Sequence, residues 1–155
     1  IEFTRTYQEL GVKVPGWITL GDVVTHVESR VPVTFSGTCR GIEIFADPML
    51  ERVFFNLVDN AIRHGGRVTE ITVSCEREPD GILVIFEDNG TGVPYADKER
   101  IFERGVGKNT GLGLFLVREI LSITAITIKE TGVYGKGARF EISVPERMYR
   151  FVTTQ

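Results

Sequence analysis

Several classes of protein are excluded by what this 155-residue sequence lacks. No apolar stretch approaches the roughly 20 residues that a membrane-spanning helix needs, and no signal-peptide pattern is present. The formal net charge of −3 argues against a general nucleic-acid-binding domain, because such domains usually carry an excess of positive charge. With only two cysteines, Cys39 and Cys75, and no cysteine–histidine cluster, the sequence predicts two free thiols in a reducing cytoplasm and leaves a disulfide open.

What remains is the composition of an ordinary globular domain. The chain is 42% hydrophobic and 25% charged, and its length fits one domain with a substantial core. It begins with Ile1 rather than Met, which indicates a fragment of a longer protein. Any membrane anchor or sensor of that protein would lie outside this chain.

Hydrophobic periodicity predicts helices and strands in alternation. Apolar residues, among them Leu50 and Leu57, recur at helical spacing after a potential N-cap at Asp47. The glycines at 65–66 would end this helix. The run 82–86 is continuously apolar, as expected of a central strand covered on both faces. We expect helices at 2–9, 20–30, 48–64 and 112–121, and strands at 32–36, 42–46, 71–75, 82–86, 125–130 and 138–144.

These elements predict an α/β fold, a two-layer sandwich of a mixed sheet with helices on one face. Residues 90–113 contain six glycines and little apolar periodicity. Long segments of this kind inside compact domains are usually functional lids, so we expect a mobile segment with one short helical turn at 101–102. Pro145 is expected to close the last strand.

The helix predicted over 48–64 carries a polar stripe beside its apolar face. At 100° per residue, Asn56, Asn60 and Arg63 lie on this stripe. Asparagine is a poor helix former, and a carboxamide oxygen is a suitable hard ligand for Mg²⁺. Arg63 and His64 can reach phosphate oxygens or flank a nucleotide. An exposed asparagine pair on an amphipathic helix is the competing interpretation.

Asp88 stands at the carboxyl end of the predicted central strand. An unpaired buried carboxylate is very costly, and the exocyclic amine of adenine would be a suitable donor to it. Gly90 and Gly92 would let a base approach the backbone closely. An ordinary Asx turn at 88–90 explains the same residues.

A third segment, Thr-Gly-Leu-Gly-Leu at 110–114, opens a predicted helix. Free backbone N–H groups and close glycines at a helix N-terminus form an anion site suited to phosphates, and Lys108 would add positive charge. A glycine-rich loop with tight helix packing is the alternative. The sequence has no G-x-x-x-x-G-K-[ST] motif, and its G-x-G segment at 105–111 has the wrong spacing for G-x-G-x-x-G. In this order, the three segments predict an ATP site.

The segments resemble those of the catalytic ATP-binding domain of sensor histidine kinases, in the superfamily that includes DNA gyrase, heat-shock chaperones and mismatch-repair ATPases. Residues 56–64 are similar to the family's N box, and 88–92 to its first glycine box. Residues 101–104 resemble the F box, 110–114 the second glycine box, and 135–145 the last hairpin. Four ordered motifs make the resemblance specific.

The resemblance, over roughly residues 20–145, implies a Bergerat-type fold. This is a two-layer sandwich with a mixed, mostly antiparallel sheet, about three helices on one face and a mobile ATP lid at 92–111. It also implies a division of the chain. Residues 1–12 would be the tail of a dimerisation helix with its linker, 13–150 the catalytic domain, and 151–155 a C-terminal tail.

By the same resemblance, ATP and Mg²⁺ are the expected cofactors. Asn60 would ligate Mg²⁺, Asp88 would accept a hydrogen bond from the adenine amine, and Asn56 would position metal-bound water or phosphate. Asn56, Asn60 and Arg63 are the implied catalytic residues. The implied nucleotide-binding residues are Asn56, Asn60, Arg63, His64, Asp88, Gly90, Gly92, Val93, Lys108, Thr110, Gly111, Leu112 and Gly113.

The residue type at Asn56 also distinguishes ATP hydrolysis from phosphoryl donation. The gyrase and chaperone branches typically have glutamate at the corresponding position, whereas an amide is a negligible base. The resemblance therefore implies donation of the γ-phosphoryl group rather than efficient hydrolysis. The acceptor would be a histidine on a separate dimerisation domain, with a response regulator downstream of it.

The same resemblance implies neither nucleic acid nor membrane contact for this domain. It would be cytoplasmic, in a parent protein that is either soluble or membrane-anchored. Three alternatives remain open from the sequence. They are a conformational ATPase module, a non-catalytic nucleotide-binding regulator, and a serine kinase that acts on a regulatory protein.

Overall fold

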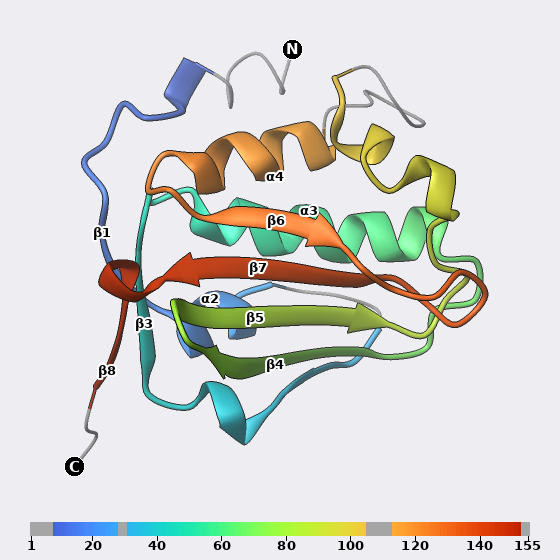
Figure 1. The fold of residues 1–155 in the computed structure, drawn as a ribbon, viewed down its shortest axis with the longest axis horizontal. Coiled ribbons are helices and arrows are strands. Elements are labelled where there is room, and N and C mark those ends of the chain that lie inside the picture. The colour runs from blue at the N-terminus through green and yellow to red at the C-terminus, as the bar shows by residue number, and fades with distance from the viewer. Residues whose placement is uncertain (1–7, 28–30, 105–112, 153–155) are drawn as a thin grey trace.

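The computed structural model describes residues 8–27, 31–104 and 113–152 (Figure 1). Its helices are α2 (Leu20–Thr25), α3 (Leu50–His64) and α4 (Gly113–Ser122). Its strands are β1 (Gly16–Thr19), β2 (Val33–Phe35), β3 (Ile42–Ala46), β4 (Ile71–Glu78), β5 (Gly81–Asp88), β6 (Thr127–Glu130), β7 (Arg139–Pro145) and β8 (Tyr149–Phe151). Four short 3-10 turns are η1 (Gly37–Cys39), η2 (Tyr95–Asp97), η3 (Arg100–Phe102) and η4 (Glu146–Met148). None of the helices in these ranges has the length and hydropathy to cross a membrane.

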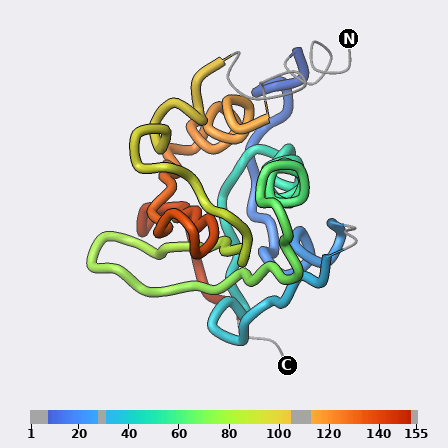
Figure 2. The backbone as a smooth tube through the Cα atoms, turned by 90° about the vertical axis from the view of Figure 1, so that its right-hand side faces the viewer, coloured from blue at the N-terminus to red at the C-terminus, as the bar shows by residue number. Residues whose placement is uncertain are grey.

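The main sheet has five strands in the order β2-β4-β5-β7-β6. Strand β2 runs parallel to β4, and every other neighbouring pair is antiparallel. Helices α2, α3 and α4 lie on one side of this sheet (Figures 1 and 2). The predicted α/β sandwich, with its mixed and mostly antiparallel sheet, is confirmed.

Helix α3 forms the centre of the core, as its periodicity predicts. Six apolar side chains are buried along it: Leu50, Val53, Phe54, Leu57, Val58 and Ala61. The helix begins at Leu50, slightly later than expected, because the chain first makes a turn in which the Asp47 carboxylate accepts a hydrogen bond from the Met49 N–H at 2.9 Å. Asp47 therefore caps this first turn.

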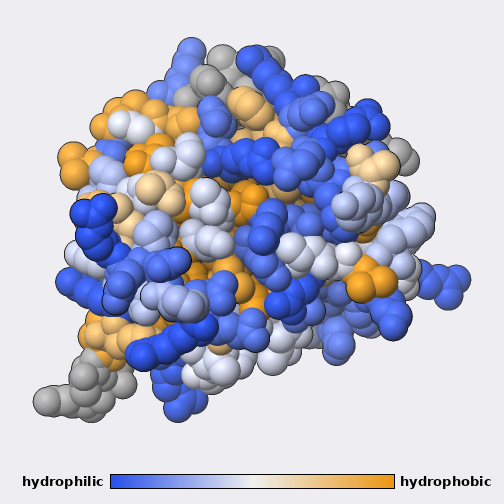
Figure 3. Space-filling model, viewed as in Figure 1, coloured by the Kyte–Doolittle hydropathy of each residue, from blue (hydrophilic) through white to orange (hydrophobic). Residues whose placement is uncertain are grey.

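Strand β5 is central and buried on both faces, as predicted. Its side chains at Ile82, Val84 and Phe86 belong to the core. The opposite face carries Leu83 and Ile85, which are also buried. Charged side chains of β4, β5 and β7 cover this face: Arg139 pairs with Glu76, Glu87 and Glu141 at 3.8, 3.5 and 3.2 Å. Figure 3 shows this side of the molecule as mainly hydrophilic, with apolar spots between polar side chains.

A second sheet, β1-β3-β8, was not predicted. The sequence predicts no strand at 16–19 or 149–151, and Pro145 is predicted to close the last strand. Strand β7 does end there, but η4 then leads into β8, which pairs antiparallel with β3. On this sheet Trp17 packs edge-on against Phe45, with ring centroids 5.3 Å apart. Figure 1 places the second sheet at the end of β5 opposite to Asp88.

Helix α2 and strand β6 are shorter than predicted. Helix α2 ends at Thr25 rather than at residue 30, after a run of β-branched residues that are weak helix formers. Strand β6 begins at Thr127 rather than at residue 125, because Ala125 adopts a left-handed conformation with φ of 62° in the turn that precedes it. Of the helix expected at 2–9, residues 8 and 9 are helical and the rest lie outside the described residues.

Replacing Ala125 by glycine should stabilise the chain. A Cβ atom makes the left-handed region unfavourable, whereas glycine enters it freely and loses some stability through its greater freedom in the unfolded state. We expect a net gain of about 0.5–1 kcal/mol in the free energy of unfolding, measured by urea denaturation. Ala46→Gly, in the regular strand β3, should lower it instead. A loss of stability in Ala125→Gly would contradict the assigned strain.

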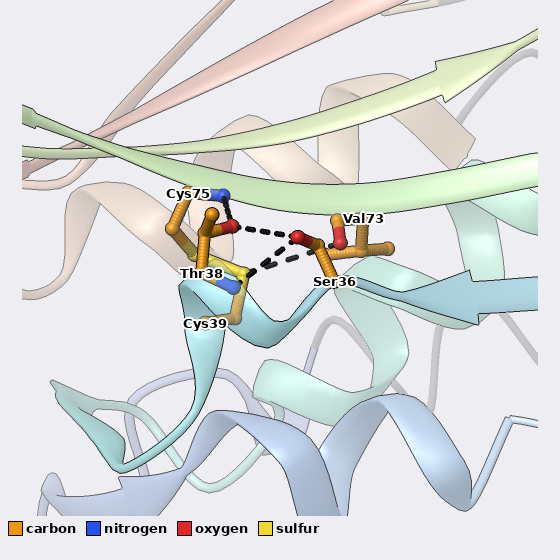
Figure 4. Close-up of a disulfide and its surroundings, with 5 residues drawn as sticks. All are labelled: Ser36, Thr38, Cys39, Val73 and Cys75. Carbon is orange, nitrogen blue, oxygen red and sulfur yellow. Dashed lines mark hydrogen bonds between the residues drawn. A yellow bond between two sulfur atoms is a disulfide. The ribbon is translucent and has the colours of Figure 1, made fainter.

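The expectation of two free thiols is wrong, because Cys39 and Cys75 form a disulfide with Cα atoms 5.2 Å apart. The parallel pairing of β2 with β4 brings η1 beside β4, although 36 residues separate the two cysteines. Around the disulfide, the Cys75 N–H donates to Thr38 Oγ1 at 2.9 Å, and Thr38 donates to Ser36 Oγ (Figure 4).

Reduction of this disulfide should destabilise the domain. A crosslink over 36 residues lowers the entropy of the unfolded chain enough to contribute about 3–4 kcal/mol in the loop-closure description. We expect the urea midpoint to fall when a reductant is added, and Cys39→Ser/Cys75→Ser to show the lower midpoint with or without reductant. An identical midpoint for the wild type in both conditions would contradict a stabilising crosslink.

Candidate functional site

Helix α3 connects the segments that the sequence predicts to form one site. The Asn56 side chain is partly buried, and its Nδ2 donates to the carbonyl oxygen of Gly113 at 3.1 Å. Gly113 is the first residue of α4 and belongs to the 110–114 segment that is expected to bind phosphates, so this bond ties α3 to that segment. At a rise of about 1.5 Å per residue, the partly buried Asn60 lies about 6 Å further along the helix.

The C-terminal end of α3 contacts the loop after β5. The carbonyl oxygen of Gly65 accepts hydrogen bonds from the Thr91 N–H at 2.7 Å and from Thr91 Oγ1 at 3.1 Å. A Cβ atom on Gly90 would lie only 2.2 Å from the same oxygen. Gly90 is therefore required by the approach of two backbone segments, which is a different reason from the contact with a base that the sequence suggested.

Asp88 ends β5 and is almost completely buried. Its Oδ1 atom accepts hydrogen bonds from the N–H groups of Gly90 at 2.8 Å and Ala138 at 3.2 Å. The described residues supply no hydrogen bond to its Oδ2 atom. Burial raises the pKa of Asp88, and the nearby negative charge of Glu130 raises it further, against the two backbone bonds that lower it. A donor at Oδ2 would favour the ionised carboxylate.

The expected Asx turn and the expected base contact therefore use different oxygen atoms of Asp88. The Oδ1 bond to the Gly90 N–H is the Asx turn. Because that turn holds the carboxylate in place, it also fixes the direction of Oδ2, which accepts no hydrogen bond from the described residues. The two interpretations of the sequence are compatible in this structure.

Gly92 and Val93 follow on the same loop. Gly92 has a φ of 83°, and a Cβ atom there would lie 2.9 Å from the carbonyl oxygen of Gly137. Val93 is partly buried, and its carbonyl oxygen accepts a hydrogen bond from Lys98 Nζ at 3.2 Å. The chain then turns through η2 and η3 to Phe102, which is buried edge-on against Phe140 with centroids 6.1 Å apart. The short helical turn expected at 101–102 is part of η3.

Arg63 and His64 are exposed at the end of α3. The Arg63 guanidinium forms a salt bridge with Asp59, one turn earlier, with both Nε–Oδ distances at 2.9 Å. A phosphate that binds Arg63 would have to displace Asp59 or share the guanidinium group with it. Four further expected nucleotide-binding residues lie outside the described residues: Lys108, Thr110, Gly111 and Leu112.

Three residues beside this site were missed as site residues in the sequence. Asn89 accepts from the N–H groups of Thr69 and Glu70, which fixes the chain between α3 and β4. Lys98 and Glu130 form a buried ion pair next to Val93. A single charged residue in a sequence normally indicates a solvent-exposed side chain. No local pattern therefore identifies Lys98 and Glu130 as a buried pair.

The residues present fit a nucleotide with its metal. A largely buried carboxylate with one oxygen atom that accepts no hydrogen bond from the described residues suits the amine of adenine, and the close backbone contacts of the glycines hold the loop around it. Asn60 has an amide oxygen of the kind that ligates Mg²⁺, on the helix that joins this loop to Gly113.

Comparison with known proteins shows which family this chain is similar to. Residues 46–148 match the family described as histidine kinase-, DNA gyrase B- and HSP90-like ATPase. The sensor protein KinB for alginate biosynthesis, from Pseudomonas aeruginosa, is 39% identical over 101 residues, covering 62% of this chain and 17% of KinB. The sensor histidine kinase ZraS from Salmonella typhi is 33% identical over 142 residues, covering 83% of this chain and 30% of ZraS. The chain thus spans less than a third of either relative.

Solved structures show the same fold. The ATP-binding domain of PrrB from Mycobacterium tuberculosis matches 86% of this chain and 98% of its own, with a TM-score of 0.70 and 23% identity. Full-length ShkA in complex with AMPPNP matches 92% of this chain and 32% of its own, with a TM-score of 0.73 and 21% identity. With its fold, its motifs and the matched family in agreement, the chain belongs to the histidine kinase-, DNA gyrase B- and HSP90-like ATPase family, as an ATP-binding domain of the sensor histidine kinase kind.

Proposed function

We propose that this chain binds ATP with Mg²⁺ and donates the γ-phosphoryl group to a histidine on a separate dimerisation domain of a two-component sensor kinase. The observation that carries the proposal is the buried Asp88 carboxylate. Two backbone N–H groups hold its Oδ1 atom, and its Oδ2 atom has no hydrogen bond from the described residues. This arrangement supports recognition of a base that presents an amine.

The other residues have roles along α3. Asn60 would hold Mg²⁺, and Asn56, bonded to Gly113, would keep the start of α4 beside the phosphates. When bound, Mg²⁺ neutralises the negative charge that develops on the transferred phosphoryl group. Arg63 would contact a phosphate in place of Asp59, and His64 would lie beside the nucleotide.

Asn56 supports phosphoryl donation over hydrolysis. A carboxylate at this position could remove a proton from an attacking water molecule, whereas an amide is a negligible base. Its Nδ2 atom donates one of its two protons to Gly113, and neither the second N–H nor the amide oxygen can act as a base. The conformational ATPase alternative needs another base.

The proposed partners rest on the likeness to sensor histidine kinases, of whose length this chain covers less than a third. A dimerisation domain with the phosphoacceptor histidine would precede residue 13, and a response regulator would receive the phosphoryl group from it. We propose residues 13–150 as the ATP-binding domain, 1–12 as the end of the dimerisation helix with its linker, and 151–155 as a tail. The domain would face the cytoplasm, whether or not its parent protein is anchored in a membrane.

Phosphoryl transfer in trans tests this function. The 155-residue chain is mixed with γ-labelled ATP, Mg²⁺ and a helical-hairpin dimerisation domain that carries the acceptor histidine. We expect label on that histidine, no label on the chain itself, and little release of inorganic phosphate. Rapid phosphate release without transfer would favour the ATPase alternative, and binding without either reaction would favour a non-catalytic regulator.

A further inference from the structure

A buried ion pair lies beside the Asp88–Gly92 loop. Glu130 ends β6 with a fully buried side chain, and Lys98 follows η2 with a side chain that is 18% exposed. Buried charges are costly unless they are paired and fully hydrogen-bonded. The backbone groups that hydrogen-bond to these two side chains therefore show which segments the pair connects.

Every proton of the Lys98 ammonium group has an acceptor. Nζ donates to Glu130 Oε1, to the carbonyl oxygen of Gly132 at 2.8 Å and to that of Val93 at 3.2 Å. The Glu130 Oε2 atom accepts from the N–H groups of Gly132 and Arg139, both at 3.0 Å. The pair thereby fastens the turn between β6 and β7 to the backbone directly after Gly92.

The turn between β6 and β7 also packs directly against the Asp88–Gly92 loop. The Gly135 N–H donates to the carbonyl oxygen of Thr91 at 2.6 Å, and the Ala138 N–H donates to Asp88 Oδ1 at 3.2 Å. A Cβ atom on Gly137 would lie 2.0 Å from the carbonyl oxygen of Asp88. With contacts this close, a shift of the turn would displace Asp88.

We infer that Lys98 and Glu130 are positioning residues whose ion pair, the Lys98–Glu130 clamp, holds the Asp88–Gly92 loop in the shape that receives adenine. This inference rests on the proposed function of Asp88. It assigns the pair a role in nucleotide recognition beyond its contribution to stability.

The neutral double variant Lys98→Met/Glu130→Gln separates these two roles. The glutamine oxygen can still accept from the β6–β7 turn, while the bond to Val93 is lost and no buried charge remains unpaired. We expect ATP to bind at least about 10-fold more weakly by calorimetry, at a temperature where the variant is fully folded. In the nucleotide-free chain, we expect the Gly135 and Ala138 amides, which contact neither side chain, to exchange at least about 10-fold faster.

The matched control is Arg150→Met/Glu43→Gln. It removes an ion pair of 2.7 Å in the second sheet, and it should change neither ATP affinity nor these exchange rates. Unchanged affinity and exchange in the Lys98/Glu130 variant would overturn the clamp while ATP binding by the wild type still supports the proposed function. A wild-type chain that binds no ATP would overturn the proposed function, and amide exchange would then decide separately whether the clamp orders the loop.

Discussion

Asp88→Asn should weaken ATP binding by at least about 100-fold while the fold remains intact. The new amide oxygen can keep both backbone bonds that Oδ1 accepts from Gly90 and Ala138. The amide NH₂ would then stand in place of Oδ2, so that a donor would face the adenine amine, which is itself a donor. Calorimetric titration with ATP measures the loss. Asp80→Asn is the control and should bind like the wild type, because Asp80 is exposed and directly precedes β5, at the end of the strand opposite to Asp88.

The same substitution should raise the stability of the nucleotide-free chain at neutral pH. Because burial raises the pKa of Asp88 in the folded state, ionisation of the group costs folding free energy at any pH above the raised pKa. That cost decreases as the pH falls through the folded pKa, and it is absent below the unfolded value of about 3.9. The melting temperature of Asp88→Asn should therefore exceed that of the wild type at pH 7 and approach it near pH 4. Unchanged ATP affinity, or lower stability at pH 7, would contradict the roles assigned to Asp88.

Asn60→Ala should remove the effect of Mg²⁺ on ATP binding and lower the rate of phosphoryl transfer by about 100-fold or more. The side chain lies on the polar side of α3, between the bond to Gly113 and the contact at Gly65, and is not required for the core. Titration with and without Mg²⁺ separates the metal effect from affinity for the base. Glu51→Ala, in the first turn of the same helix, should keep the full metal effect. A metal effect that survives in Asn60→Ala would place the ligand elsewhere.

Long elements with a regular pattern could be predicted from the sequence. Helix α3 buries one face, and β5 is buried on both, so each carries a local signal of its final surroundings. The second sheet carries no such signal. Its strands β1 and β8 are four and three residues long, and they become strands only by pairing with β3.

The candidate site likewise has features that local sequence patterns predict and features that they do not. Asp88, Asn56 and the glycines lie in short motifs with local turn or helix geometry, and the chemistry of each residue type is clear from the sequence. The disulfide depends instead on the parallel pairing of β2 with β4, and the Lys98–Glu130 clamp joins residues 32 positions apart. Both form only when distant segments meet, and therefore neither has a local pattern.

Calorimetric titration of the wild-type chain with ATP and with GTP, each with and without Mg²⁺, tests the nucleotide site most directly. GTP presents a carbonyl oxygen where adenine presents its amine, so it offers the Asp88 carboxylate an acceptor instead of a donor. We expect ATP to bind, Mg²⁺ to strengthen its binding, and GTP to bind at least about 10-fold more weakly. Equal affinity for the two nucleotides, or no binding of ATP, would contradict the assignment of Asp88 as the residue that recognises the base.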